Sequence, residues 1–223
     1  RGGDAFLQAQ PGKSNQTLVF FDTDGRAYAT PAHTLPSARS QGEPLTGRFK
    51  PKGEARFVGV ALGDSDSKVL LGSSAGFGFV APLGELVTKN KAGKTCLSVP
   101  AGGQALRPQT LTSELLAAED SMVAAATNQG RLLVFPLHQL PELSRGKGNK
   151  LLSIPSAAFK NGEEALVAMV ALAVTDSLVV HAGQRHLTIK PKDLAAYVGE
   201  RARRGRKLPR GFQKAEDLSV QEK

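Results

Sequence analysis

The feature that most constrains this chain of 223 residues is a β-hairpin pattern that occurs four times. The first copy is LVFFDTDGRAYAT (18–30), where Asp24-Gly25 predicts a tight turn because glycine adopts a positive φ without steric cost. The other copies are VLLGSSAGFGFVA (69–81), MVAAATNQGRLLVF (122–135) and LVVHAGQRHLTI (178–189). The turn glycines Gly25, Gly76, Gly130 and Gly183 are 51, 54 and 53 residues apart, which indicates a structural repeat.

Other residues recur at similar offsets after each turn. A proline follows at positions 31, 82, 136 and 191, and predicts the end of a strand because proline cannot donate to the ladder. A leucine comes next, at positions 35, 86, 140 and 194, where we expect a short helical turn to place it beneath the sheet. A second glycine then stands in each of the loops ARSQGEP, TKNKAGKT, SRGKGNK and RARRGRK. We expect a further strand after each loop, in LTGRF, TCLSV, LLSIP and, less clearly, LPRGF.

These repeats predict an all-β protein. A lone sheet of this size cannot bury both faces, so we expect four-stranded blades that are stacked or arranged radially. The blades are expected at about 15–65, 66–118, 119–174 and 175–223, within a single domain over 1–223. Residues 1–14 align with the second half of a repeat, with Gly3 on Gly93. The expectation is therefore a partial first blade and a fragment of a longer polypeptide.

The charge balance indicates a polyanionic partner. Lys and Arg number 29 against 20 Asp and Glu, a formal net charge of +9. Residues 1–144 carry 14 bases and 12 acids, whereas residues 145–223 carry 15 bases and 8 acids, so the positive charge is concentrated toward the C-terminus. The single cysteine, Cys96, excludes an internal disulfide and a cysteine-rich zinc site, and favours a cytoplasmic protein. No apolar run is long enough to predict a membrane span.

The four loops are the candidate binding site, because radial repetition would place them along one rim where their fields add. Their glycines Gly42, Gly93, Gly148 and Gly205 are expected to let the backbone approach phosphate oxygens while basic side chains supply charge. Stacking aromatic residues are nearly absent from the loops, so duplex DNA is favoured over single strands. The candidate DNA-binding residues are Arg39, Arg48, Lys50, Lys89, Lys91, Lys94, Arg145, Lys147, Lys150, Arg201, Arg203, Arg204, Arg206, Lys207 and Arg210.

Other motifs are better explained by structure than by chemistry. GSSAG (72–76) matches a serine-hydrolase pattern, but a strand rather than a helix follows Ser74, so we interpret it as a hairpin turn. The four histidines show no metal-ligand spacing, and GKGNK lacks the remainder of a phosphate loop. We therefore expect no enzyme activity, cofactor or metal in this segment. A propeller whose basic rim binds an acidic protein partner remains an alternative.

Three segments resemble one protein family. SNQTLVFFDTDGRAYATPAHTLPSARSQGEPLTG (14–47), LPELSRGKGNKLLSIPSA (140–157) and GERARRGRKLPRGFQ (199–213) are similar to the C-terminal domain of the A subunit of bacterial topoisomerase IV (ParC), which is related to that of DNA gyrase. The resemblance covers essentially the whole chain. It implies a β-pinwheel, a propeller-like ring or open C whose blades exchange strands, with DNA bent around a basic outer rim, and we expect the ring to be open or broken.

The same resemblance implies partners and a role. The partners are duplex DNA, the remainder of the A subunit, and, through it, the B subunit, with association to the bacterial nucleoid. The catalytic tyrosine and the ATPase of such an enzyme would lie elsewhere, and Tyr28 and Tyr197 occupy blade positions. The gyrase heptamer QRRGGKG has no intact copy here, and Gln41-Gly42-Glu43 departs furthest from it. This difference favours DNA bending and a topology preference for decatenation and supercoil relaxation over gyrase-like wrapping.

Overall fold

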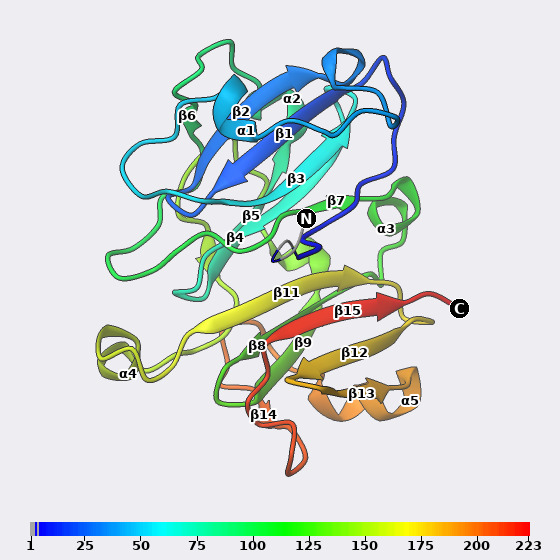
Figure 1. Cartoon of the computed structure of the whole chain (residues 1–223). Helices are drawn as coiled ribbons and strands as arrows, with labels where there is room; N and C mark the ends of the chain where they lie inside the picture. Colours follow the sequence, from blue (N-terminus) through cyan, green and yellow to red (C-terminus); the bar gives the residue numbers. More distant parts are fainter. Residues whose placement is uncertain (1–2, 4) are drawn as a thin grey trace.

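The computed structural model describes every residue of the chain except 1, 2 and 4. Its strands form three four-stranded sheets and one three-stranded sheet, and all the strand pairs within these sheets are antiparallel. In Figure 1 the sheets follow one another in chain order, from β1 (blue) to β15 (red), and none closes into a barrel. The predicted all-β fold class is therefore confirmed. The partial blade expected for residues 1–14 falls partly outside the described residues, and residues 5–14 form no strand.

Each sheet is described from one edge strand to the other. The first sheet consists of β3 (Phe57–Gly63), β1 (Thr17–Asp22), β2 (Arg26–Pro31) and β6 (Lys94–Thr95). The second consists of β10 (Asn149–Lys150), β5 (Phe77–Pro82), β4 (Lys68–Gly72) and β7 (Gln109–Leu111). The third consists of β11 (Leu166–Leu172), β8 (Met122–Thr127), β9 (Arg131–Pro136) and β14 (Arg206–Lys207). The fourth consists of β13 (Arg185–Ile189), β12 (Ser177–Ala182) and β15 (Asp217–Gln221).

Short helices connect the strands. The α-helices are α1 (Leu45–Arg48), α2 (Leu83–Leu86), α3 (Ser113–Ala117), α4 (Ser156–Lys160) and α5 (Pro191–Leu194). The 3-10 helices are η1 (Ala32–Thr34), η2 (Leu137–Gln139) and η3 (Ala195–Tyr197). The four predicted hairpins are all present, as β1-β2, β4-β5, β8-β9 and β12-β13. Pro31, Pro82 and Pro136 each end a strand as predicted.

Each four-stranded sheet contains a strand from the following repeat. A hairpin and one further strand come from the same repeat, but the fourth strand comes from a later basic loop, and its residues are 67–76 positions from their partners in the hairpin. Thus β6 pairs with β2, β10 with β5, and β14 with β9. This strand exchange is the arrangement that the resemblance implied. Among the described residues, β13 of the fourth sheet has no such partner.

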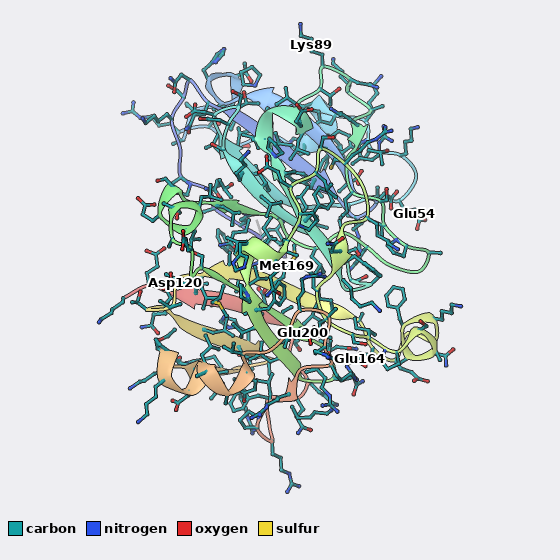
Figure 2. The ribbon with its side chains drawn as sticks, turned by 180° about the vertical axis from the view of Figure 1, so that it is seen from behind. Glu54, Lys89, Asp120, Glu164, Met169 and Glu200 are labelled. Carbon is teal, nitrogen blue, oxygen red and sulfur yellow. The ribbon has the colours of Figure 1, made fainter. Side chains whose placement is uncertain are left out.

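The hydrophobic core lies between consecutive sheets, in three clusters of buried Leu, Val, Ala and Phe side chains. The inner strands β3, β7, β11 and β15 line a central cleft of about 650 Å³. Two glutamine side chains satisfy backbone groups at this cleft: the Gln8 amide bonds both N–H and C=O of Val60, and that of Gln109 both groups of Ala171. Met169, labelled near the middle of the molecule in Figure 2, is buried in the same region.

The structure differs from the sequence predictions after the prolines. Leu86, Leu140 and Leu194 are buried, but Leu35 is 37% exposed. The first three belong to core clusters that include strands of the preceding sheet, and the described residues contain no sheet before β1. The strand predicted in LTGRF is wrong, because Leu45–Arg48 is the helix α1.

The strands after the other three loops are shorter than predicted. They lie on the polar residues 94–95, 149–150 and 206–207, whereas TCLSV, LLSIP and LPRGF continue largely without strand pairing. The apolar residues that follow are nevertheless buried, as Cys96, Leu97, Leu151, Leu152 and Leu208 show. These residues therefore anchor each loop in the core.

Candidate nucleic-acid interface

Three of the four basic loops supply the outer edge strand of a sheet, namely β6, β10 or β14, and the loop at residues 39–50 contains no strand. Gly93, Gly148 and Gly205 all have a positive φ, and a Cβ atom on any of them would overlap the strand on which its loop docks. On Gly148 that atom would overlap the carbonyl oxygen of Gly78 in β5. These three glycines therefore have a packing role against the preceding sheet, and their approach to phosphate stays a prediction. Gly42 has φ 73° but has open space around it.

Backbone hydrogen bonds join successive loops to one another. We call residues 39–50, 89–98, 144–153 and 199–210 together the basic ribbon. Its joining hydrogen bonds are Lys50 N–H to Lys91 O (2.7 Å), Ser98 N–H to Gly146 O (2.8 Å), Gly146 N–H to Cys96 O (2.9 Å), Ala202 N–H to Leu151 O (3.0 Å) and Ser153 N–H to Arg203 O (2.9 Å). The four loops are thus one connected structure and not four separate loops.

The residue after each of the first three turn glycines contacts the loop that docks beside it. Arg26 donates from Nε to the carbonyl of Ala92 (2.9 Å) and from Nη2 to that of Gly93 (2.7 Å). Arg131 donates to the carbonyl of Gly205 (3.4 Å), and the ring of Phe77 lies 4.3 Å from the ammonium of Lys147. Each of these three hairpins therefore helps to position the basic loop of the next repeat.

The fourth hairpin has a different turn. Ala182 pairs directly with Arg185, so Gly183 is the first of two turn residues instead of the last residue of a longer turn. In the first and third hairpins, the buried side chains of Asp22 and Thr127 accept backbone N–H groups within the turn. The fourth repeat therefore has a different turn geometry, although its turn glycine follows at a similar spacing.

Several predicted DNA-binding residues are held by the protein itself. Arg204 makes a bidentate ion pair with the buried Glu164 (2.8 and 2.6 Å). Arg48 is bound by Glu43 and Thr34. Three further side chains donate to backbone carbonyls: Lys94 to that of Glu85, Arg201 to that of Lys150, and Lys207 to that of Gln129. Arg203 forms an ion pair with Glu200.

The other predicted residues are exposed on the basic ribbon. They are Arg39, Lys50, Lys89, Lys91, Arg145, Lys147, Lys150, Arg206 and Arg210. Lys89 extends from one end of the molecule in Figure 2. The structure thus divides the predicted set into cations that hold the ribbon together and cations that face solvent.

Two titratable groups lie at the second loop, residues 89–98. The Cys96 thiol is buried and donates to the Gly25 carbonyl (3.2 Å), and burial raises its pKa to about 12. The Tyr28 hydroxyl donates to Asp22 (2.6 Å). Burial, and then this hydrogen bond to the carboxylate, raise the pKa of the Tyr28 phenol well above its ordinary value. Neither group is available at neutral pH as a nucleophile.

The described residues offer little for other chemistry. Ser74 lies in the turn between β4 and β5, and its hydroxyl accepts the backbone N–H of Gln104 (2.9 Å), as the hairpin interpretation of GSSAG requires. No group of three or more His, Cys, Asp or Glu side chains in the described part of the chain could hold a metal ion. Within the same residues, no helix has the length and apolarity needed to cross a membrane.

Sequence reasoning missed three residues of this interface. Arg26 and Arg131 each follow a turn glycine in the repeat, so their shared position was an available signal. Glu164 had no such signal, because it is one of two adjacent glutamates and its partner Arg204 is 40 residues away.

Known proteins match both the sequence and the structure. The family model for the DNA gyrase C-terminal domain, a β-propeller, matches residues 67–105 and 121–173. The solved C-terminal domain of Escherichia coli ParC is 39% identical with a TM-score of 0.83, and the match covers 100% of this chain and 88% of that one. The chain belongs to the family of C-terminal domains of topoisomerase IV A subunits. Domains of this family are accessory domains, as expected from the sequence.

Full-length relatives agree with this assignment. The A subunit of DNA topoisomerase 4 from Pseudomonas aeruginosa is 47% identical over 99% of this chain, and that from Escherichia coli K12 is 41% identical over 99%. The chain spans only 29% and 28% of these relatives, which is less than a third of their length. A solved DNA gyrase A C-terminal domain, 13% identical with a TM-score of 0.72 over 93% of this chain and 66% of that one, shares the fold.

Proposed function

We propose that this domain binds and bends duplex DNA along the basic ribbon, as a non-catalytic part of a topoisomerase IV A subunit. In this role it would tune the preference of the enzyme for DNA topology in decatenation and supercoil relaxation. The remainder of the A subunit, and through it the B subunit, would be its protein partners, and the enzyme would act at the nucleoid. The catalytic tyrosine and the ATPase would lie outside this segment. The chain would act as one pinwheel domain, with blades near the boundaries predicted from the sequence.

The observation that carries this proposal is the continuity of the basic ribbon. Backbone hydrogen bonds link the loops of successive repeats, which supports a single surface shared by their exposed cations. Duplex DNA presents a regular series of phosphates that such a surface can neutralise together. The ribbon holds a single aromatic residue, Phe49, which is buried, so the ribbon itself offers bases no exposed aromatic ring on which to stack.

Bending is energetically accessible to such a surface. Smooth bending of 20–30 base pairs costs on the order of 1–6 kcal/mol. Several charge-assisted contacts to phosphate can offset this cost. A ribbon that passes from sheet to sheet therefore favours a bent duplex over a straight one.

A salt titration tests the proposal. The dissociation constant for a fluorescein-labelled, mixed-sequence duplex of 30 base pairs would be measured by anisotropy at several NaCl concentrations. If about 6–10 phosphates are neutralised, the affinity falls by about 10³–10⁵ between 50 and 200 mM salt. An affinity that stays flat over this range refutes the proposal and leaves the acidic protein partner as the better explanation of the charge.

A pair of variants locates the contact. Exchanging Arg145 and Lys147 for Gln removes two charges from the basic ribbon. Exchanging Lys13 and Lys192 for Gln removes the same charge from exposed positions outside it. The first variant is expected to lose affinity and about two units of salt slope, and the second to retain both.

A further inference from the structure

Glu164 is an acidic residue buried next to the most basic segment of the ribbon. Its side chain is 3% exposed, and the residue lies after a turn, two positions before β11 begins at Leu166. One carboxylate oxygen accepts from Arg204 Nη1 (2.8 Å) and from the Thr127 hydroxyl (2.8 Å), and the other accepts from Arg204 Nη2 (2.6 Å). Charged groups are rarely buried unless they are paired and hydrogen-bonded, and this carboxylate fulfils both conditions.

The ion pair determines where residues 199–206 run. Arg204 Nη1 also donates to the carbonyl of Ser153 (3.2 Å), so its guanidinium joins two successive segments of the ribbon to the third sheet. The same segment contains Ala202, whose φ of 68° is the only positive value at a non-glycine among the described residues. The left-handed conformation is unfavourable for alanine, so the surrounding contacts must impose it.

We infer that Glu164 is a positioning residue for DNA binding: it fixes Arg204 and thereby holds the exposed Arg206 toward phosphate. This inference rests on the proposed function. Simple electrostatics gives the opposite expectation, because an acid near a DNA-binding surface repels phosphate and its removal should tighten binding. The two explanations therefore differ in the sign of one measurement.

The test compares Glu164→Gln with Glu163→Gln. Both substitutions remove one negative charge at neighbouring positions, but Glu163 is exposed and its side chain does not contact the 199–206 segment. Dissociation constants for the 30-base-pair duplex would be measured from 50 to 200 mM NaCl. The temperature would be well below the melting temperature of each variant, so that a loss of global stability does not alter the result.

The expected result is weaker binding for Glu164→Gln. The slope of about −0.9 per phosphate means that each contact raises the affinity about eightfold at 100 mM salt relative to 1 M salt. Loss of one contact should therefore raise the dissociation constant at 100 mM salt about eightfold and reduce the salt slope by about one. Glu163→Gln should bind as tightly as the wild type or slightly more tightly. Equal or tighter binding by Glu164→Gln would overturn the inference.

A second substitution covers the case in which Glu164→Gln does not fold. Glu164→Asp keeps the charge but withdraws the carboxylate by one methylene, and Glu163→Asp is its control. Weaker binding by Glu164→Asp alone supports positioning, and equal binding by both refutes it. If the wild type itself binds DNA without salt dependence, the proposed function fails. If the wild type binds with the proposed salt dependence but the Glu164 variants bind as tightly as the wild type, the positioning role alone is wrong.

Discussion

Replacing Gly148 by alanine should release the SRGKGNK loop from the sheet on which it docks. The new Cβ atom would overlap the carbonyl oxygen of Gly78, so β10 cannot remain paired with β5. Gly42→Ala is the matched control, because Gly42 also has a positive φ but has open space around it. Both variants incur the cost of a left-handed alanine, and only the first also loses the docked loop.

The magnitudes of the two effects can be estimated. A left-handed alanine costs about 1–2 kcal/mol. Loss of the short β10 pairing removes backbone hydrogen bonds at about 0.5–1.5 kcal/mol each. Partial exposure of Leu151, which is fully buried, forfeits part of the roughly 1.5–3 kcal/mol of its burial. Gly148→Ala should therefore lower the free energy of unfolding by about 3–5 kcal/mol, and Gly42→Ala by about 1–2 kcal/mol.

Urea denaturation followed by circular dichroism measures both values under the same conditions. The difference between the two variants isolates the contribution of loop docking, because their backbone cost is shared. If Gly148→Ala is no more destabilising than Gly42→Ala, the docking role assigned to the loop glycines is refuted.

Further predictions concern buried groups and individual phosphate contacts. The Cys96 thiol should react with a disulfide reagent at pH 8 only after unfolding, since it is buried with its pKa raised to about 12; rapid reaction of the native protein would contradict this. The folded state keeps the Cys96 and Tyr28 protons at a pH where the unfolded chain releases them. The free energy of unfolding should therefore fall as pH rises above about 8.5, and fall more steeply above about 10, in alkaline denaturation titrations. Exchanging Lys150 and Arg206 for Gln should reduce the salt slope of DNA binding by about two, and an unchanged slope would show that neither contacts phosphate.

The repeats made much of the fold predictable. Local signals, namely alternating strand formers, turn glycines and terminating prolines, placed all four hairpins and three of the four leucines that were predicted to be buried. Leu35 was misplaced because its burial depends on a neighbouring sheet and not on its own segment. LTGRF was misassigned as a strand because the repeat register suggested a pairing that those residues do not make.

The candidate site was predictable in position but not in the roles of its residues. Charge and repetition identified the loops, yet both signals treat every basic residue alike. Arg204 and Arg206 are two residues apart, but one is half-buried in an ion pair with Glu164 and the other is exposed. The pairing spans 40 residues and depends on how the third sheet folds, so no local pattern shows it.

Hydrogen exchange with and without a 30-base-pair duplex tests the central claim most directly, because it reports which segments of the domain DNA covers. We predict that amides in residues 89–98, 144–153 and 199–210 are protected together on binding, while those of α3 exchange as they do in the free protein. Protection confined to a single loop, or found mainly outside the basic ribbon, would contradict the claim that the linked loops form one continuous DNA-binding surface.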